Sequence, residues 1–199
     1  MKVAFVVYTP MTVLDFVGVY DPLTRLQSMG FIPDLTWEIC AIAESVGDSH
    51  GLGIVPTQIN QPLDSFDLLI VPGGITPLVY ELTKNAQLLE WLQTARNCKL
   101  KVSVCTGSLL LGAAGFLNGK KATTHPNAYD LLQDFCEVVT DQRVVDAGDV
   151  ITARGVTASI DLGLYLCEKF VGVDATKKIR AMMDYPYVVT IGRNSNDSR

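Results

Sequence analysis

The sequence predicts an α/β fold in which helices cover both faces of a mainly parallel sheet. Nearly unbroken apolar runs of strand length at 3–8 and 67–71 lack the polar alternation of half-exposed strands, which is typical of parallel strands buried on both faces. Helix-forming segments separate these runs, and alternating strands and helices favour right-handed crossovers around a parallel sheet. Because a (β/α)8 barrel needs more than 199 residues, we expect a flavodoxin-like, doubly wound α/β/α sandwich.

The first half of the chain contains clear helix and turn signals. Asp21 as an N-cap and Pro22 at the first helical position predict a helix over 21–29. Gly51 and Gly53 interrupt the segment 46–59, which predicts a small antiparallel strand pair outside the main alternation. Leucines and a tryptophan at helical spacing predict a helix over 83–97. The strands of this half are expected at 3–8, 37–43 and 67–71.

The second half continues the alternation of strands and helices. The β-branched run 102–104 predicts a strand that stops at a cysteine, and an apolar helix-forming segment follows to about residue 115. Pro126 predicts the start of a helix after a short strand. Alternating residues around a turn predict a hairpin over 138–153. The remaining elements are expected at 122–125 (strand) and at 126–132, 160–170 and 173–183 (helices).

Composition limits the functional classes. The chain is 48% hydrophobic, which supplies a large core, and we expect one domain over residues 1–185 followed by a polar tail over 186–199. The net charge is −5 and the basic residues are scattered. This argues against a nucleic-acid partner and against binding to an anionic membrane surface.

The cysteine count points to a reduced compartment. Five cysteines at irregular spacing and only two histidines disfavour a disulfide framework and a zinc site. The apolar run at 3–8 is too short for a signal peptide or a membrane span. We therefore expect a cytoplasmic protein with no metal and no membrane association.

Cys105 lies where the predicted strand 102–104 turns sharply into a helix. A thiol at a helix N-terminus meets unpaired amides and the positive end of the helix dipole, which favour thiolate over thiol. Gly107 supplies the small neighbour that a tight elbow requires. The same pattern is also consistent with a cysteine that is simply buried in the core, as cysteines often are. The stretch alone does not separate these alternatives.

Three stretches are predicted to meet at the carboxyl-terminal edge of the sheet, where ligands bind in open α/β folds. They are Asp15 after the first strand, Gly73-Gly74 after the strand 67–71, and Cys105-Thr106. A thiolate can attack an electrophilic carbon while a carboxyl group moves protons. The backbone amides of Gly74 and Thr106 are candidates for an oxyanion hole. The coincidence favours a catalytic site over a turn and a helix cap.

Two further residues have two interpretations each. His125 ends a predicted strand, where it either orients or deprotonates the thiol or is satisfied by the backbone. Arg154 either contacts an anion or forms a surface ion pair. The glycines match neither dinucleotide-binding nor P-loop spacing, so nucleotide binding has little support.

Four short motifs then carry a family resemblance: V-P-G-G at 71–74, V-C-T-G at 104–107, K-A-T-T-H at 121–125 and T-A-R-G-V-T-A-S-I-D at 152–161. In this order they resemble the ThiJ/PfpI superfamily over about residues 2–185, and the L-D-F-V-G segment with the C-T-G elbow is most similar to its isonitrile hydratase subgroup.

The resemblance implies a site and a reaction. Cys105 is the implied nucleophile, Asp15 its acid partner and Thr106 a required neighbour in the elbow. The implied reaction adds water to a small-molecule isonitrile and yields an N-substituted formamide. The resemblance also implies a homodimer and no metal or organic cofactor.

The departures from the family pattern matter. Peptidase members carry histidine directly after the cysteine, so Thr106 argues against proteolysis. Glyoxalase and deglycase members usually have glutamate where this chain has Asp15, but they share the threonine pair before His125 and an arginine resembling Arg154, which leaves glutathione-independent glyoxalase activity as the alternative. A third alternative is a ligand or redox sensor that uses Cys105. We expect no helix-turn-helix segment of the AraC type in 199 residues.

Overall fold

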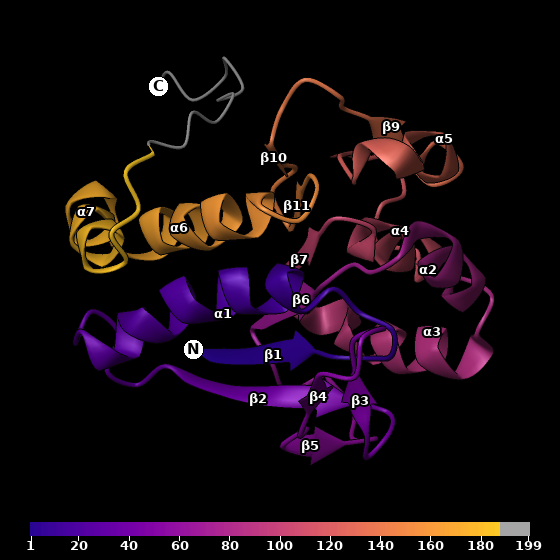
Figure 1. The fold of residues 1–199 in the computed structure, drawn as a ribbon, viewed down its shortest axis with the longest axis horizontal. Coiled ribbons are helices and arrows are strands. Elements are labelled where there is room, and N and C mark those ends of the chain that lie inside the picture. Colours follow the sequence, from indigo (N-terminus) through magenta and orange to yellow (C-terminus); the bar gives the residue numbers. More distant parts are fainter. Residues whose placement is uncertain (188–199) are drawn as a thin grey trace.

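The computed structural model describes residues 1–187 and is built around a seven-stranded sheet with the order β10-β11-β7-β6-β1-β2-β5 (Figure 1). Every neighbouring pair in this sheet is parallel except β10 with β11. The strands are β1 (Lys2–Val6), β2 (Thr36–Ala41), β5 (Gln58–Ile59), β6 (Leu68–Val71), β7 (Leu100–Val104), β10 (Val144–Asp146) and β11 (Val150–Ala153).

The topology is that of a flavodoxin-like sheet. Taken in chain order, the long parallel strands β1, β2, β6, β7 and β11 lie in the order 2-1-3-4-5 that defines this fold. The order reverses between β1 and β6, and ligands bind at such a switch point. The predicted fold class is confirmed.

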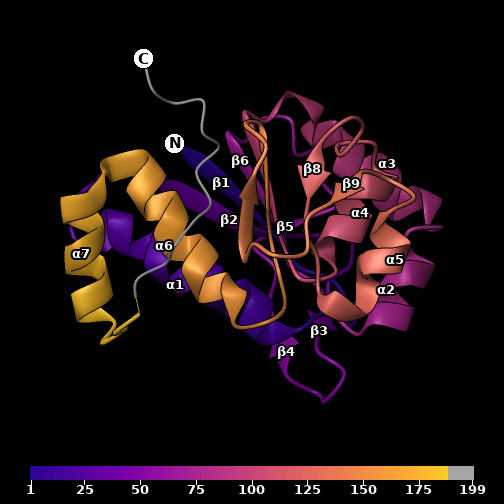
Figure 2. The same ribbon diagram turned by 90° about the horizontal axis from the view of Figure 1, so that it is seen from above.

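Helices form a layer on each side of the sheet. Figure 2 shows α1, α6 and α7 on one side and the other helices on the opposite side. The first group comprises α1 (Val13–Ser28), α6 (Ala158–Val171) and α7 (Val173–Met182). The second comprises α2 (Thr76–Leu82), α3 (Ala86–Gln93), α4 (Gly107–Ala113) and α5 (Tyr129–Leu132), with 3-10 turns at Thr94–Asn97 and Pro126–Ala128.

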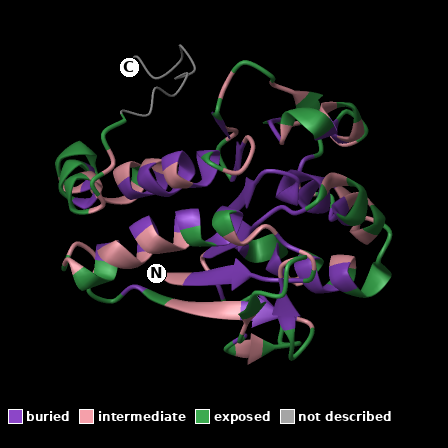
Figure 3. Cartoon of the chain, viewed as in Figure 1, coloured by how far each residue is buried: buried purple, intermediate pink, exposed green. Residues whose placement is uncertain are grey.

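The central strands are covered on both faces, and β6 is apolar throughout. Every residue of β6, β7 and β11 is buried, and Figure 3 shows this burial as a continuous core. No polar face is needed on such strands, which explains the unbroken apolar runs in the sequence.

The smaller pairings follow the predicted pattern. β3 (Val46–Gly47) and β4 (Gly53–Ile54) form the small antiparallel strand pair, and β10 and β11 form the predicted hairpin. β8 (Lys121–Ala122) and β9 (Glu137–Val138) form a separate parallel pair.

The predicted start of the first helix is wrong. α1 begins at Val13, so Asp15 lies in its first turn and Pro22 lies inside the helix. Asp21 forms an ion pair with Arg25 one turn later, at 2.8 Å, instead of capping. Proline inside a helix loses one backbone hydrogen bond, but here its ring packs closely on α6, since a Cβ on Gly163 would lie 2.4 Å from Pro22 Cγ.

The single helix predicted over 83–97 is also wrong. The chain forms α2 before this range and then starts again at α3, because the Asn85 side chain accepts a hydrogen bond from the Leu88 amide at 3.0 Å and caps the new helix. The strand predicted over 122–125 ends at Ala122. There Thr123 donates its amide to Thr152 Oγ1 at 2.8 Å, away from any ladder.

Most of the polar tail predicted over 186–199 lies outside the described residues, which end at 187. Within residues 1–187, the helices all fall short of the length and apolar content that a membrane crossing requires.

Candidate active site

The three stretches predicted to meet at the sheet edge do meet there. Asp15, Gly73-Gly74 and Cys105-Thr106 follow β1, β6 and β7, which are neighbours in the sheet. The Gly73 amide donates to Asp15 Oδ2 at 3.0 Å, and the Gly74 amide donates to Thr106 Oγ1 at 2.9 Å. The Thr106 hydroxyl in turn donates to the Gly74 carbonyl at 3.0 Å. The loop after β6 therefore ties the other two stretches together.

Cys105 occupies a strained elbow between β7 and α4. Its φ is +55°, in the left-handed region that residues with a Cβ adopt only a few per cent of the time. The elbow also requires Gly107, because a Cβ there would lie 2.3 Å from the Val71 carbonyl oxygen. The sequence indicated a small residue at 107, and the reason is this close approach of two backbones.

Asp15 is a buried carboxyl group with one vacant oxygen. Burial raises its pKa to about 7, and the Gly73 amide and the neighbouring Cys105 thiol oppose this shift in that order. Its Oδ1 atom has no hydrogen-bond partner. The thiol is a neighbour without a well-aligned hydrogen bond, a common arrangement for catalytic pairs without substrate. Near neutral pH Asp15 can therefore both accept and donate a proton.

The Cys105 thiol is protonated in this arrangement, which corrects the expectation of a thiolate. Burial raises its pKa to about 12, and the charge of Asp15 contributes next. A hydrogen bond from the Thr106 amide lowers the pKa but does not outweigh these effects. The helix N-terminus alone therefore does not ionise the thiol. Near neutral pH it is therefore Asp15, and not the thiol, that ionises.

A cavity of about 490 Å³ opens over the thiol. It is lined by Thr12, Gly74, Ile75, Thr76, Pro77, Cys105, His125, Asn127 and Val156. None of these residues is Asp, Glu, Lys or Arg. The cavity therefore suits an uncharged molecule with a compact apolar part.

The cavity includes some of the expected residues and omits others. Cys105, Gly74 and His125 line it, whereas Asp15 and Thr106 are fully buried beneath the surface and Arg154 is not part of the lining. The sequence interpretation missed the remaining wall residues. The available signal was proximity in the sequence, because these residues follow Gly74, lie close to His125 or Gly155, or, like Thr12, precede Asp15.

The expected oxyanion role of Gly74 finds no support in this geometry. Its amide already donates to the Thr106 hydroxyl, and the Gly73 amide is engaged by Asp15. The Thr106 amide, in contrast, acts on the Cys105 sulfur. Thr106 is therefore the stronger candidate for a backbone donor at the reacting atoms.

His125 is held by the backbone, as the second interpretation expected, and its role toward the thiol stays a prediction. Its Nδ1 atom accepts the Asn127 amide at 3.2 Å, so the backbone holds the ring, and the residue also lines the cavity. Its ring packs on Gly155, where a Cβ would lie 2.6 Å from His125 Cδ2. Arg154 lies with its guanidinium over the Tyr129 ring at 5.8 Å, which corresponds to neither expected role.

Known proteins resemble this chain in sequence over most of its length. Residues 1–169 match the DJ-1/PfpI family. An isonitrile hydratase from Pseudomonas putida is 35% identical over 186 residues, which cover 93% of this chain and 78% of the relative. A protein DJ-1 homolog A from Arabidopsis thaliana is 30% identical over 139 residues, covering 67% of this chain and 35% of that protein.

A solved structure agrees over the whole fold. The crystal structure of a ThiJ/PfpI family protein from Pseudomonas syringae has a TM-score of 0.83 at 32% identity, covering 98% of this chain and 78% of that chain. These matches confirm the resemblance found in the motifs. The chain belongs to the DJ-1/PfpI family.

Proposed function

We propose that this member of the DJ-1/PfpI family is a cysteine-dependent hydratase that converts an isonitrile, R–NC, and water into a formamide, R–NH–CHO. The observation that carries the proposal is the buried pair of Cys105 and Asp15 beneath a cavity without charged walls. An isonitrile is uncharged and compact, as this cavity requires. The 35% identity to a protein named isonitrile hydratase supports the same choice.

In the proposed first step, the Cys105 sulfur bonds to the terminal isonitrile carbon. Asp15 takes the thiol proton and delivers it to the same carbon, which gives a thioimidate, R–N=CH–S–Cys105. A carboxyl pKa of about 7 suits this transfer, because general acid-base groups work best near the ambient pH. The Thr106 amide stabilises negative charge on the sulfur.

In the second step, water adds to the thioimidate carbon. Asp15 takes one proton from the water and the nitrogen gains one proton, which gives R–NH–CH(OH)–S–Cys105. The C–S bond then breaks, the hydroxyl proton returns through Asp15 to the sulfur, and the formamide leaves. Atoms balance, since the only reactants are the isonitrile and one water.

Glyoxalase-type chemistry on a small aldehyde is the second candidate. His125 favours it, because this residue lines the cavity and offers a second proton-transfer group. The position of Arg154 over Tyr129, away from the lining, disfavours it. A sensor that works by oxidation of Cys105 is the third candidate and needs no turnover.

The test supplies purified protein with an alkyl isonitrile and, separately, with methylglyoxal, while formamide and lactate are quantified. We expect formamide from the wild type and none from Cys105→Ala. Lactate without formamide would show that the protein is a glyoxalase and not an isonitrile hydratase. No product from either compound, with ready oxidation of Cys105, would establish the sensor.

We propose further that the protein is a cytoplasmic homodimer. The exposed apolar side chains of Leu14 and Val17 on α1 support a subunit contact. Light scattering that gives the mass of one chain in solution would refute the dimer.

A further inference from the structure

The carbonyl oxygen of Cys105 is held by two side chains from different segments. Thr124, in the loop after β8, donates its hydroxyl to this oxygen at 2.9 Å, and Ser108 in α4 donates at 3.1 Å. Both donors are fully buried. The Cys105 amide is also bound, to the carbonyls of Ala153 and Arg154 at 3.0 and 2.9 Å. Hydrogen bonds therefore hold the backbone on both sides of the strained residue.

The Cys105 carbonyl and the Thr106 amide belong to one rigid peptide plane. In a trans peptide the C=O and the next N–H point in opposite directions, so an anchor on the oxygen also sets the direction of the N–H. A hydrogen bond from the Thr106 N–H lowers the pKa of the Cys105 thiol, so this N–H favours negative charge on the sulfur. Gly73 closes the other side, since a Cβ there would lie 2.5 Å from the Thr106 nitrogen.

A left-handed φ at a cysteine persists only where the surroundings impose it. α4 supplies one anchor through Ser108, which is local because it lies three residues from Cys105. The Thr124 anchor comes from a segment nineteen residues away. The position of the loop after β8 therefore influences the direction of the Thr106 N–H, through the hydrogen bond from Thr124 to the Cys105 carbonyl.

We propose that Thr124 is a positioning residue, whose hydroxyl anchors the Cys105 carbonyl and thereby aims the Thr106 amide at the sulfur. The inference rests on the proposed role of Cys105 as a nucleophile, but it does not depend on which electrophile the thiol attacks. It assigns a function to the second threonine of the T-T-H motif.

The neighbouring residue provides a matched control. Thr123 is as buried as Thr124, but its Oγ1 atom has no hydrogen-bond partner. Its contribution to the fold is its amide, which donates to Thr152 Oγ1. A Thr→Val change keeps the side-chain shape and the amide. At residue 123 it removes an unused hydroxyl, and at residue 124 it removes the anchor.

The experiment measures the rate at which iodoacetamide alkylates Cys105 at pH 8 and pH 9 in Thr124→Val, Thr124→Ser and Thr123→Val. Mass spectrometry of the peptide that contains Cys105 separates its reaction from that of the half-buried Cys136. Without the anchor, the hydrogen bond from the Thr106 amide to the reacting thiolate weakens, which predicts a roughly three- to tenfold slower reaction in Thr124→Val. Thr124→Ser and Thr123→Val should react at the wild-type rate. Equal rates in the two valine variants would overturn the proposal.

Two further measurements keep the test decisive. Circular dichroism reports whether Thr124→Val folds, and if it does not, Ser108→Ala removes the other side-chain donor to the same oxygen and keeps the longer contact from the Ser108 amide, at 3.5 Å. That variant should also slow alkylation, and an unchanged rate would refute the mechanism. Alkylation needs no substrate. If the wild type does not convert isonitriles but Thr124→Val still slows alkylation of Cys105, only the proposed function is refuted.

Discussion

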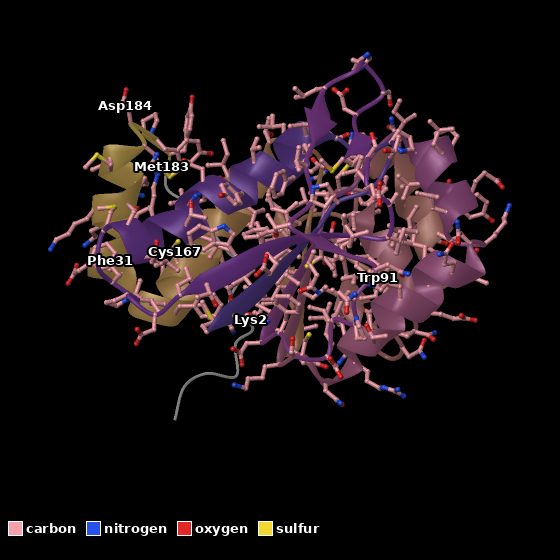
Figure 4. The ribbon with its side chains drawn as sticks, turned by 90° about the horizontal axis from the view of Figure 1, so that it is seen from below. Lys2, Phe31, Trp91, Cys167, Met183 and Asp184 are labelled. Carbon is pink, nitrogen blue, oxygen red and sulfur yellow. The ribbon has the colours of Figure 1, made fainter. Side chains whose placement is uncertain are left out.

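Cys105 and Cys167 are both buried, unpaired thiols whose pKa burial raises to about 12. Cys167, labelled in Figure 4, lies on α6 and donates to the Pro22 carbonyl of α1 at 3.3 Å. Its backbone is helical, and burial is the main cause of its raised pKa. Cys105 instead has a left-handed backbone, Asp15 as a neighbour, an amide directed at its sulfur and a cavity above it.

The comparison shows that thiol acidity without substrate does not identify the reactive cysteine. Both pKa values are raised for the same first reason, which is desolvation. Cys105 has Asp15 beside it to take its proton and a cavity that can hold an electrophile. What separates the two thiols is therefore the arrangement of partners around each, and each of the following predictions alters one partner.

The largest expected effect comes from the same change at both thiols. Cys105→Ser should lower isonitrile turnover by at least about a thousandfold, because serine is a far weaker nucleophile. Cys167→Ser should keep turnover within about twofold and lower the free energy of unfolding by roughly 1–2 kcal/mol, since it places a hydroxyl in an apolar interface. Formamide production and urea denaturation check the pair. Equal loss of turnover in both variants would contradict the assignment.

Asp15→Asn separates proton transfer from packing. Asparagine can still accept the Gly73 amide but cannot take the thiol proton, so turnover should fall by about 100- to 10,000-fold. The carboxyl pKa is about 7 in the folded protein against an ordinary 3.8, so the folded state binds the proton more tightly. Asp15 therefore costs stability as the pH rises from about 4 to 7, and the full cost remains above pH 7.

The stability of Asp15→Asn should accordingly exceed that of the wild type at pH 8, by about 4 kcal/mol at most, and should match it at pH 4. Urea denaturation at both pH values checks this. Asp21→Asn on the same helix is the control, because it removes only a half-buried ion pair and should cost about 0.5 kcal/mol without loss of turnover. A stability gain that is independent of pH would rule out the raised pKa.

Gly155→Ala should have the smallest effect. The new Cβ would lie 2.6 Å from His125 Cδ2, so the ring must move within the cavity wall, and kcat/KM should fall about tenfold. In a His125→Ala background the same change should cost nothing, because the ring it displaces is gone. Gly53→Ala, where a Cβ has no neighbour within 4 Å, is the control. A fall in kcat/KM that persists in the His125→Ala background would show that Gly155 is required for the backbone conformation and not for the position of the ring.

Much of the fold and part of the site could be predicted from the sequence because the signals are local. Unbroken apolar runs indicate strands buried on both faces, and parallel strands bring their carboxyl ends to one edge. That reasoning placed Asp15, Gly73-Gly74 and Cys105-Thr106 together. The walls of the cavity could not be predicted, because they depend on how loops such as the one carrying His125 fold back over the edge.

The sequence by itself determined the doubly wound topology, the position of the elbow and the three stretches that meet there, since periodicity and turn chemistry are properties of neighbouring residues. Only the tertiary structure decided that α1 runs through Pro22, because Gly163 of α6 leaves room for the ring. It also decided that the Gly74 amide is occupied and that the Cys105 thiol is protonated. Hydrogen-bond partners and desolvation come from segments distant in the chain, and no local pattern records them.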